Sequence, residues 1–585
     1  MTIPRLGKPS SSGVPPWGGF SAAVPSLLRD LPILAAALAV FYSLLTFSRY
    51  GVGPVNTQPE ISLSPAALPK YAVFSLIRIG LAYVLSLALT FMYGYVAAYN
   101  ARAERFMIPL LDTLQSIPVL SFLPGVMLAM VSLFPNRQLG VELGCVVLIL
   151  TGQVWNMTFS FYSSLKNIPR EMREAAQIYR MSGWQRFVQM ELPYAAIGLI
   201  WNSMMSVAGA WFFLMACEMF VLGNRDLRLP GLGSYLQTAA NAGDTRAILW
   251  GLAAMVTVII LMDQLLWRPV IAWAEKFKFE QVEAAETPRS PILDLLRRSR
   301  TLPAIARVSV RPAAEALGLR FARAYLHPQP SPYGRDLRKW VSRVLLAAIL
   351  LGVTYAVAKM SVMLAGLSRP EMQEIAMGAG ATFLRVEGTL VLAGLWTIPA
   401  GVYVGLRPRL SAIAQPIAQI AASVPATALF PIVMLMLIRV GGGLGIGAMV
   451  LLLLGTQWYI LFNVIAGASA IPSDLKEVCG VFHFPGRERW RKLFLPGIFP
   501  YLVTGFITAS GGAWNASIVA EYFRFRGQTL STIGLGAVIS QATDSGNYAV
   551  LLAATMVMAA MVMTFNRLVW RRLYALASTR YRLEG

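Results

Sequence analysis

The chain has 585 residues, of which 56% are hydrophobic and only 13% are charged. This balance excludes an ordinary water-soluble protein, because soluble domains carry about 25% charged residues. The formal net charge of +22 does not indicate a nucleic-acid interface, because basic residues that border apolar segments set membrane topology and contact anionic lipid.

Apolar segments recur along the chain, and each is long enough to cross about 30 Å of hydrocarbon as a helix. Helices are expected because backbone groups in lipid must be satisfied within the segment, whereas barrel strands would alternate polar and apolar residues. We predict a polytopic all-α membrane protein. Its twelve predicted spans are 31–48, 72–99, 108–133, 142–164, 194–222, 247–272, 344–365, 379–405, 416–438, 446–468, 497–521 and 548–573.

The spans form two sets of six, which we assign to a first unit (31–273) and a second unit (344–574). Residues 1–30 are rich in Pro, Gly and Ser and are predicted to be a disordered N-terminal segment. Residues 274–343 are predicted to be a basic cytoplasmic linker, within which ILDLLRRSR is a candidate amphipathic surface helix. Residues 575–585 form a predicted cytoplasmic tail.

The two units are copies of one another. The loop IPREMREAAQIYRMSGWQRFVQMELP (168–193) returns as IPSDLKEVCGVFHFPGRERWRKLFLP (471–496), an offset of 303 positions that continues to the end of each unit. Upstream the offset is 307, because the first copy has the longer loop between its third and fourth spans. A repeat of this length indicates a duplicated structural unit. Basic residues concentrate on the side of these loops, which places the loops and both termini in the cytoplasm.

Several chemistries are excluded by the residues present. Cys145, Cys217 and Cys479 are scattered, so neither a disulfide framework nor a metal site is indicated. His327 and His483 have no cysteine at ligand spacing, and a G-x-x-x-x-G-K-[ST] phosphate loop is absent. We therefore predict no catalytic, cofactor-binding or metal-ligating residue on this chain.

The repeated loop carries a resemblance to a known family. Glu174, Ala175 and Ala176, followed by Pro193, resemble the EAA loop of binding-protein-dependent ABC importer permeases. Glu477 and Pro496 repeat that spacing in the second copy. The surrounding sequence is similar to the nitrate/sulfonate/taurine/bicarbonate branch in its duplicated form, in which one chain carries both permease halves. The resemblance covers roughly 70–272 and 378–574.

This resemblance implies two tandem six-helix units of a type I ABC importer in a bacterial or archaeal inner membrane. It implies that ATP is bound and hydrolysed by separate ATPase subunits, and that a periplasmic or lipid-anchored binding protein delivers the solute. The implied substrate is a small oxyanion such as nitrate, bicarbonate or a sulfonate. An ion-driven secondary transporter stays open as an alternative, since some also have six-span repeats. A membrane-embedded enzyme is disfavoured because no His/Asp/Glu constellation is clustered.

The EAA loop of the family forms a short helix that docks on an ATPase subunit, and the alternative here is an ordinary basic loop. The family usually has Gly six residues after the Glu, where this chain has Arg180 and His483. Glycine reaches positive φ without a Cβ clash, so our hypothesis gives the turn to Gly183 and Gly486. Val478 and Cys479 stand where two alanines are usual.

The translocation path is sought in the membrane spans. Pro118 with Pro124, and Pro425 with Pro431, are predicted to break the third span of each copy. Polar and aromatic side chains in the fourth and fifth spans are candidates for the path, with helix packing as the equal alternative. They are Gln153, Ser206 and Trp211 in the first copy, and Gln457, Thr508 and Trp514 in the second.

Charges inside the second and fifth spans repeat in both copies. Arg78 and Arg385 lie toward the outer end of the second span, and Glu218 and Glu521 toward that of the fifth. A lone charge in a span is costly, so each is expected to have a partner. One interpretation makes the arginines attract an anionic substrate at an outer gate. We favour the other, in which Arg78 pairs with Glu218 and Arg385 with Glu521.

Overall fold

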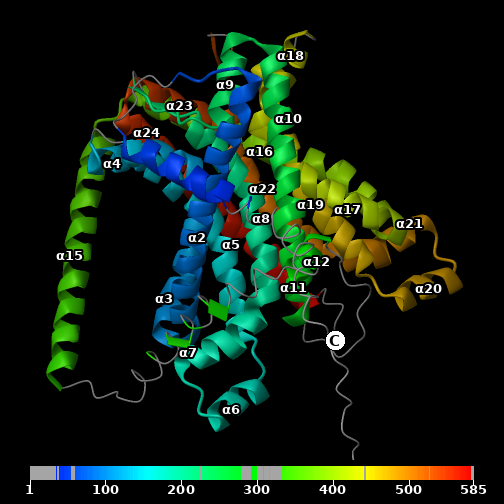
Figure 1. Ribbon diagram of the computed structural model, residues 1–585. Coiled ribbons are helices and arrows are strands. Elements are labelled where there is room, and N and C mark those ends of the chain that lie inside the picture. The colour runs from blue at the N-terminus through cyan, green and yellow to red at the C-terminus, as the bar shows by residue number, and fades with distance from the viewer. Residues whose placement is uncertain are drawn as a thin grey trace, which may run out of the picture.

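The computed structural model describes residues 35, 38–53, 60–135, 138–222, 225–277, 291–298, 332–439, 443–525 and 528–580, with a few positions between 307 and 320. The predicted disordered segment and most of the predicted linker therefore lie outside the described residues. Helices dominate the described chain, which confirms the predicted all-α membrane class (Figure 1).

The first unit is a helical bundle with one short hairpin. Its long helices are α2 (Leu68–Tyr99), α5 (Gln138–Lys166), α8 (Leu192–Glu218) and α10 (Thr245–Met262). Shorter elements join them: η1 (Pro65–Ala67), α3 (Ala101–Ser116), η2 (Val119–Phe122), α4 (Leu123–Leu133), α6 (Arg170–Ile178), α7 (Gly183–Arg186), η3 (Phe187–Glu191), β1 (Val221–Leu222), β2 (Arg225–Asp226), α9 (Leu232–Ala242), η4 (Asp263–Trp267), α11 (Arg268–Ala274), η5 (Glu275–Phe277) and the separate α12 (Pro291–Arg298).

The second unit repeats this order. Its long helices are α15 (Pro332–Ala365), α16 (Arg369–Gly405), α19 (Leu444–Ser469), α22 (Leu495–Ala520) and α24 (Tyr548–Phe565). The shorter elements are α17 (Pro408–Ser423), α18 (Ala426–Arg439), α20 (Ser473–Val481), α21 (Gly486–Arg489), η7 (Trp490–Phe494), β3 (Tyr522–Phe525), β4 (Gln528–Ser531), α23 (Leu535–Ser545), η8 (Asn566–Trp570) and α25 (Arg571–Arg580). In each unit an antiparallel hairpin precedes the short helix α9 or α23.

Eight helices in the described part of the chain are long and apolar enough to cross a membrane. They correspond to the second, fourth, fifth and sixth predicted spans of each unit. The third span of the first unit is broken as predicted, because two helices flank Pro118 and meet at 86°; counted as one span, this pair makes nine. The third span of the second unit also breaks, between α17 and α18 at Pro425. Part of the first predicted span, 31–48, lies outside the described residues. Within the predicted span 344–365, the apolar part of the helix is Leu350–Ala365, which is shorter than the eight candidate spans.

Close helix packing forms the core of each unit. Helix α5 packs between α2 and α8, and α19 packs between α16 and α22. Gly94 and Gly401, which the repeat relates, allow these close approaches. A Cβ at Gly94 would lie 2.7 Å from the ring of Phe161, and one at Gly401 would lie 2.7 Å from Val464. Small residues at such contacts are typical of packed membrane helices.

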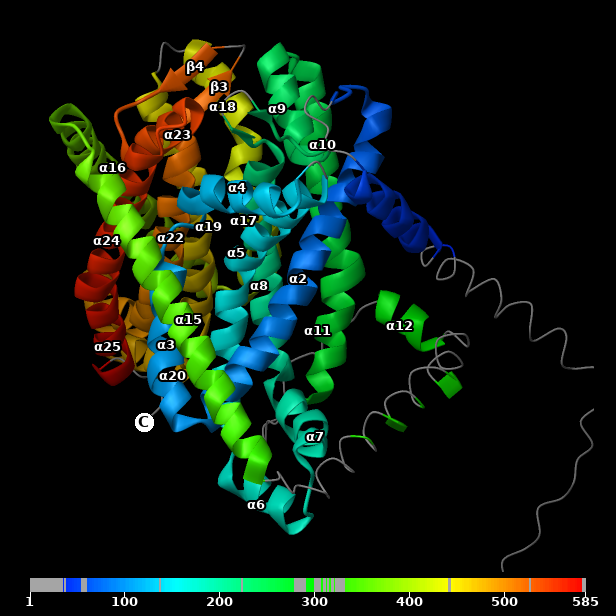
Figure 2. The same ribbon diagram turned by 90° about the vertical axis from the view of Figure 1, so that its left-hand side faces the viewer.

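The two units also contact each other. Helices α17 and α18 pack against α8 and α10, while η2 packs against α22. The Leu120 amide donates to Asn515 Oδ1 at 3.4 Å, and Thr555 Oγ1 donates to the Ser121 carbonyl at 3.2 Å. One end of the bundle carries α6 and α20, which we name the loop end (Figure 2). The opposite end carries both hairpins with α9 and α23, and we name it the hairpin end.

Candidate functional site

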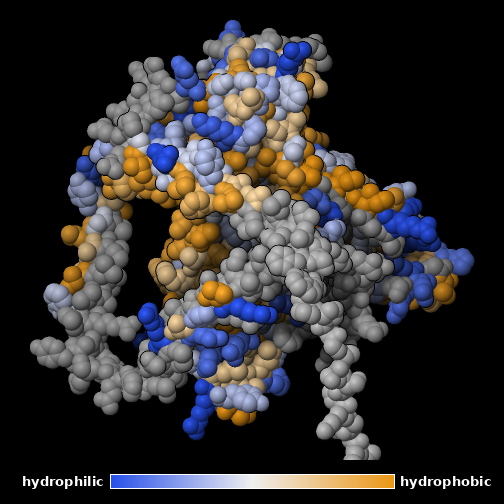
Figure 3. All heavy atoms as spheres, in the orientation of Figure 1, coloured by the Kyte–Doolittle hydropathy of each residue, from blue (hydrophilic) through white to orange (hydrophobic). Residues whose placement is uncertain are grey.

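At the loop end, the two repeated loops form short helices that share an exposed glutamate and a buried residue two positions after it. On α6, Glu174 is exposed, Ala175 is half-buried and Ala176 is buried. On α20, Glu477 is exposed and Cys479 is buried in the position that Ala176 holds in the first unit. Hydrophilic side chains gather around α6 and around α20 and α21, whereas hydrophobic ones face outward over α17 (Figure 3).

Both helices end on exposed apolar side chains. Ile178 and Tyr179 are 79% and 76% exposed, and the related Val481 and Phe482 are 74% and 69% exposed. Large apolar side chains this exposed, in the same place in both copies, are typical of a contact surface. Each loop thus presents an acidic residue and an apolar tip outward, with a small buried residue facing its own unit.

The turn after each short helix corrects one hypothesis. Arg180 (φ 48°) and His483 (φ 49°) occupy the left-handed region, whereas Gly183 and Gly486 are the first residues of α7 and α21 and do not. The Met181 amide donates to the Ala176 carbonyl, and the Arg180 amide to that of Gln177. This Schellman pattern requires positive φ directly after the last helical turn. Gly183 comes three residues too late, so our assignment of the turn to Gly183 and Gly486 is wrong.

The helices that follow begin earlier than predicted. A continuous helix runs from Gly183 to Glu218, and another from Gly486 to Ala520, so Pro193 and Pro496 lie inside them. The π-helical segments η3 and η7 immediately precede these prolines. A π-helical turn changes the local hydrogen-bond pattern, and such turns accommodate residues that would break a regular helix. Pro193 and Pro496 nevertheless stand in the first turn of α8 and α22, where a proline needs no helical amide partner.

The first loop is tied to α2 by a polar network. Glu191 is fully buried; its Oε1 lies 2.6 Å from Arg186 Nε and accepts a hydrogen bond from the Tyr99 hydroxyl at 2.5 Å. Arg186 Nη2 also reaches the Tyr95 hydroxyl at 3.1 Å. In the second unit Phe494 stands in place of Glu191 and contacts Trp490 edge-on at 5.7 Å. The glutamate that ties the first loop to α2 is thus replaced, in the second unit, by an aromatic side chain that contacts its own segment η7.

Near the hairpin end, Arg78 forms a fully buried ion cluster. Its Nη1 lies 2.7 Å from Glu218 Oε1, and its Nε and Nη2 each lie 2.7 Å from a Glu142 oxygen. Glu218 also accepts from Ser75 Oγ and from the Gly233 amide, at 2.7 and 2.8 Å. The predicted Arg78–Glu218 pair is therefore present, and Glu142 is a partner that sequence reasoning missed.

The second unit has the related but smaller cluster. Arg385 Nη1 pairs with Glu521, which confirms the second predicted pair. Glu521 accepts from Thr382 Oγ1 and from the Gly536 amide, both at 2.8 Å. The residue related to Glu142 is Gly445, so this cluster has one carboxylate fewer. The Arg385 side chain is 11% exposed, compared with 0% for Arg78.

Glycines shape both ion clusters. A Cβ at Gly231 would lie 2.2 Å from the Glu218 carboxyl group, and one at Gly534 would lie 2.1 Å from Glu521. The repeated Gly-Leu-Gly at 231–233 and 534–536 is the sequence signal that could have located this contact, because closely approaching backbone favours glycine. The clusters tie the second and fifth spans to the start of α9 and α23.

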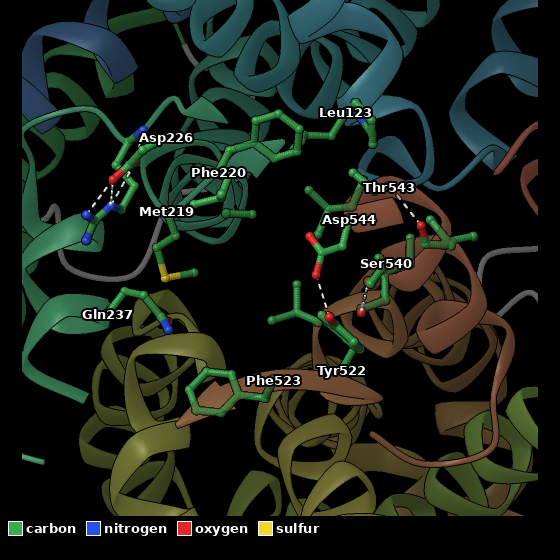
Figure 4. A pocket seen from close by; sticks show the side chains of 18 of the residues that line it. Leu123, Met219, Phe220, Asp226, Gln237, Tyr522, Phe523, Ser540, Thr543 and Asp544 are labelled. Carbon is green, nitrogen blue, oxygen red and sulfur yellow. Dashed lines mark hydrogen bonds and ion pairs between the residues drawn. The ribbon is translucent and has the colours of Figure 1, made fainter. Parts of the chain in front are cut away.

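Between the units at the hairpin end lies a cavity of about 400 Å³ (Figure 4). Eleven of its nineteen lining residues are aliphatic, proline, methionine or phenylalanine, and Phe220 and Phe523 face it from opposite units. Its polar side chains come from β2, the segment after it, β3, α9 and α23. They are Asp226, Arg228, Gln237, Asn241, Tyr522, Ser540, Thr543 and Asp544.

The predicted path residues do not line this cavity. Gln153 and Gln457 are buried, as are Ser206, Trp211 and Trp514, while Thr508 is exposed and donates to the Thr504 carbonyl. Gln153 accepts from Ser86 on α2 at 3.4 Å, a contact that ties α2 to α5. Their assignment to the path stays a prediction. Sequence reasoning missed the cavity residues because they come from helix ends and hairpins of both units.

The fold and the paired loops define a polytopic helical membrane permease built from two tandem units. The family described as "Binding-protein-dependent transport system inner membrane component" matches residues 90–266 and 397–582, and the chain belongs to this family. The two matches fall one in each unit, which confirms the duplicated form predicted from the repeat.

Three similar proteins are permeases named for anions. The chain is 26% identical over 189 residues to the bicarbonate transport system permease protein CmpB of Synechococcus elongatus, covering 32% of this chain and 65% of CmpB. It is 24% identical over 227 residues to the putative aliphatic sulfonates transport permease protein SsuC of Bacillus subtilis, covering 38% and 77%. It is 27% identical over 162 residues to the nitrate import permease protein NrtB of Synechococcus elongatus, covering 28% and 54%. The match thus spans less than two thirds of CmpB and of NrtB.

Proposed function

We propose that this chain is the transmembrane permease subunit of an ATP-binding-cassette importer, whose two units together form the translocation pathway. The observation that carries the proposal is the pair of loops at one end of the bundle. In each, an exposed glutamate and an exposed apolar tip lie on a short helix whose other side packs on its own unit. Two related docking helices suit two ATPase subunits, either two copies of one protein or a pair.

The loop end is then cytoplasmic, as the basic residues of the loops predict, and both termini lie on that side. The hairpin end faces the periplasm, where a periplasmic or lipid-anchored binding protein delivers the solute. The names of the relatives support a small oxyanion as the substrate class. No chemistry on ATP is assigned to this chain, because hydrolysis belongs to the partner subunits.

The test is ATP-coupled uptake by the full chain reconstituted with its ATPase and binding protein. Glu174→Lys and Glu477→Lys reverse the charge on the two docking helices and are expected to reduce coupled uptake at least tenfold. Glu171→Lys is the matched control, because Glu171 is also exposed on α6 but outside the loop motif. Uptake driven by an ion gradient without any nucleotide would contradict the proposal and favour a secondary transporter. Full uptake by both loop variants would show that Glu174 and Glu477 are not needed for docking on the ATPase.

A further inference from the structure

The first loop is fastened to α2 by a cluster of charged and phenolic side chains. Arg186, the last residue of α7, has its Nε 2.6 Å from Glu191 Oε1 and donates from Nη2 to the Tyr95 hydroxyl at 3.1 Å. Its guanidinium lies 4.8 Å from the ring centroid of Tyr99, whose hydroxyl donates to the same Glu191 oxygen at 2.5 Å. We name these four residues the Arg186 cluster. Because Tyr95 and Tyr99 lie at the end of α2, the cluster joins α2 to α7 and η3.

The second unit shares only the arginine of this cluster. Its other three members have apolar counterparts there: Val402 for Tyr95, Leu406 for Tyr99, and Phe494 for Glu191. The side chains of valine, leucine and phenylalanine have no hydrogen-bonding group. Arg489, the counterpart of Arg186, donates from Nε to the Phe484 carbonyl of its own loop at 2.8 Å. The arginine that reaches α2 in the first unit is thus turned back onto its own loop in the second.

A separate set of contacts distinguishes the two loop ends in the same way. Arg173 on α6 donates from Nη2 to the Lys166 carbonyl at the end of α5, at 3.0 Å. Lys166 Nζ in turn lies 2.8 Å from a Glu104 oxygen on α3. The counterparts of Lys166 and Glu104 are Ser469 and Ser411, whose hydroxyl oxygens lie 3.4 Å apart. A charged pair in the first unit is therefore a pair of hydroxyl groups in the second.

These contacts make the first docking helix, α6, part of one rigid body. Helix α2 is joined to the segment that continues into α8 at both ends, by the Arg186 cluster at the loop end and by the Arg78–Glu218 pair near the hairpin end. Hydrogen bonds weaken steeply away from their preferred angles, whereas the hydrophobic effect is non-directional. Apolar packing at the loop end of the second unit therefore resists a change of angle less than the Arg186 cluster does.

We propose that Arg186, Tyr99 and Glu191 are positioning residues that make the two docking helices unequal transmitters of ATP-driven movement. A displacement imposed on α6 by an ATPase subunit is passed to α2 through a contiguous network of side chains, which is how coupling travels between distant sites. Part of the same displacement at α20 is absorbed between its loop and α16. The inference rests on the proposed function, because it assigns unequal shares to the two docking helices which that function requires.

The first arm of the test uses the purified full chain in lipid nanodiscs, without ATP or a partner protein. Backbone amide exchange is measured by mass spectrometry in segments 170–181 and 473–484, because local opening reports how firmly a segment is held. The variant Tyr99→Leu with Glu191→Phe gives the first unit the side chains of the second and leaves no carboxylate buried without its partners. Exchange in 170–181 should rise at least threefold, with 473–484 unchanged as the internal control.

Tyr99→Phe keeps this arm decisive if the double variant fails to fold. It removes a single hydroxyl group and should raise exchange in 170–181 by a smaller factor, again without an effect on 473–484. If exchange in 170–181 were unchanged in either variant, or rose equally in both segments, the proposal would be overturned.

The second arm measures the ATP hydrolysed per solute taken up by the full chain reconstituted with its ATPase and binding protein. Arg186→Met with Glu191→Phe should raise this ratio at least threefold. The matched variant is Arg489→Met in the second unit, which already has Phe494, and it should leave the ratio nearly unchanged. A merely structural role would lower hydrolysis and uptake together by reducing the amount of folded transporter. An unchanged ratio in the first unit, or equal increases in both units, would contradict the proposal.

The two arms separate this inference from the proposed function. If the wild-type complex took up solute without ATP, the proposed function would fail, while the exchange experiment would still report how each loop is held. If the wild-type complex were ATP-coupled and the Arg186 and Arg489 variants behaved alike, only the unequal transmission would be refuted.

Discussion

Replacing Arg78 tests whether its cluster acts as a structural clasp. Arg78 is fully buried and donates to Glu142, Glu218 and the Pro230 carbonyl at distances of 2.7–2.9 Å. Removing one partner of a buried ion pair costs about 3–5 kcal/mol, because the remaining charge stays buried without compensation. We expect Arg78→Met to lower the free energy of unfolding by an amount in the upper part of that range, since two carboxylates remain behind.

The three-member composition of the cluster makes the test specific. Adding Glu218→Gln to Arg78→Met should recover only part of the loss, because Glu142 stays buried and charged. Adding Glu142→Gln as well should recover most of it, because no uncompensated carboxylate then stays buried, while the amide that Glu218→Gln introduces can still accept from Ser75 and Gly233. In the second unit Arg385→Met with Glu521→Gln should recover most of its loss without a third change.

The assay is equilibrium unfolding of the purified chain in mixed detergent micelles, with coupled uptake measured in parallel. If the cluster is a structural clasp, the free energy of unfolding and the coupled uptake should both recover in the triple variant, Arg78→Met with Glu218→Gln and Glu142→Gln. If Arg78→Met with Glu218→Gln alone restored full stability, the role assigned to Glu142 would be refuted. If the stable triple variant still failed to take up solute, Arg78 would have a direct role in the path.

Three further predictions concern backbone geometry and the first loop. Arg180→Gly should stabilise the chain by about 1 kcal/mol in unfolding experiments, because a non-glycine residue in the left-handed region costs about 1–2 kcal/mol. Gly183→Ala should be tolerated, because a Cβ at this position meets open space. Destabilisation by Gly183→Ala would instead show that Gly183 does form the turn. Gly231→Ala should lower the unfolding midpoint and the yield of folded protein, because its Cβ would overlap the Glu218 carboxyl group, and Gly209→Ala, which meets nothing within 4 Å, is the control that should not. Tyr99→Phe should cost about 0.5–1.5 kcal/mol of stability by removing the hydrogen bond to buried Glu191, and an unchanged stability would show that this bond does not hold the loop.

The architecture could be predicted from the sequence, since each pattern that indicates it involves many residues. Apolar composition predicted membrane helices, and the repeat predicted two units, because each pattern extends over tens of residues. The break at Pro118 was predictable since proline both lacks an amide donor and clashes with a regular helix. The Arg78–Glu218 and Arg385–Glu521 pairs were predictable because a lone charge in a span is costly and both copies contain both signs.

Other features depended on geometry that residue types do not encode. The turn after α6 was misassigned because glycine was expected wherever φ is positive, whereas the hydrogen bonds of the helix end fix that position at Arg180. Glu142 was missed because comparing the two copies draws attention to what they share, and its counterpart is Gly445. The cavity could not be predicted because its walls come from residues that are up to about 400 positions apart.

A comparison of the two units distinguishes positions that the fold requires from positions around the cavity that vary. Both copies keep glycines where a Cβ would overlap a buried carboxylate, at Gly231 and Gly534, so any side chain there would displace the cluster that holds the fifth span. Around the cavity the two units differ more, because the related positions Asn241 and Asp544 line it with an amide in the first unit and a carboxylate in the second. Since both units are encoded on one chain, a charge can be introduced into one wall of the cavity alone, which a permease made of two identical subunits cannot do.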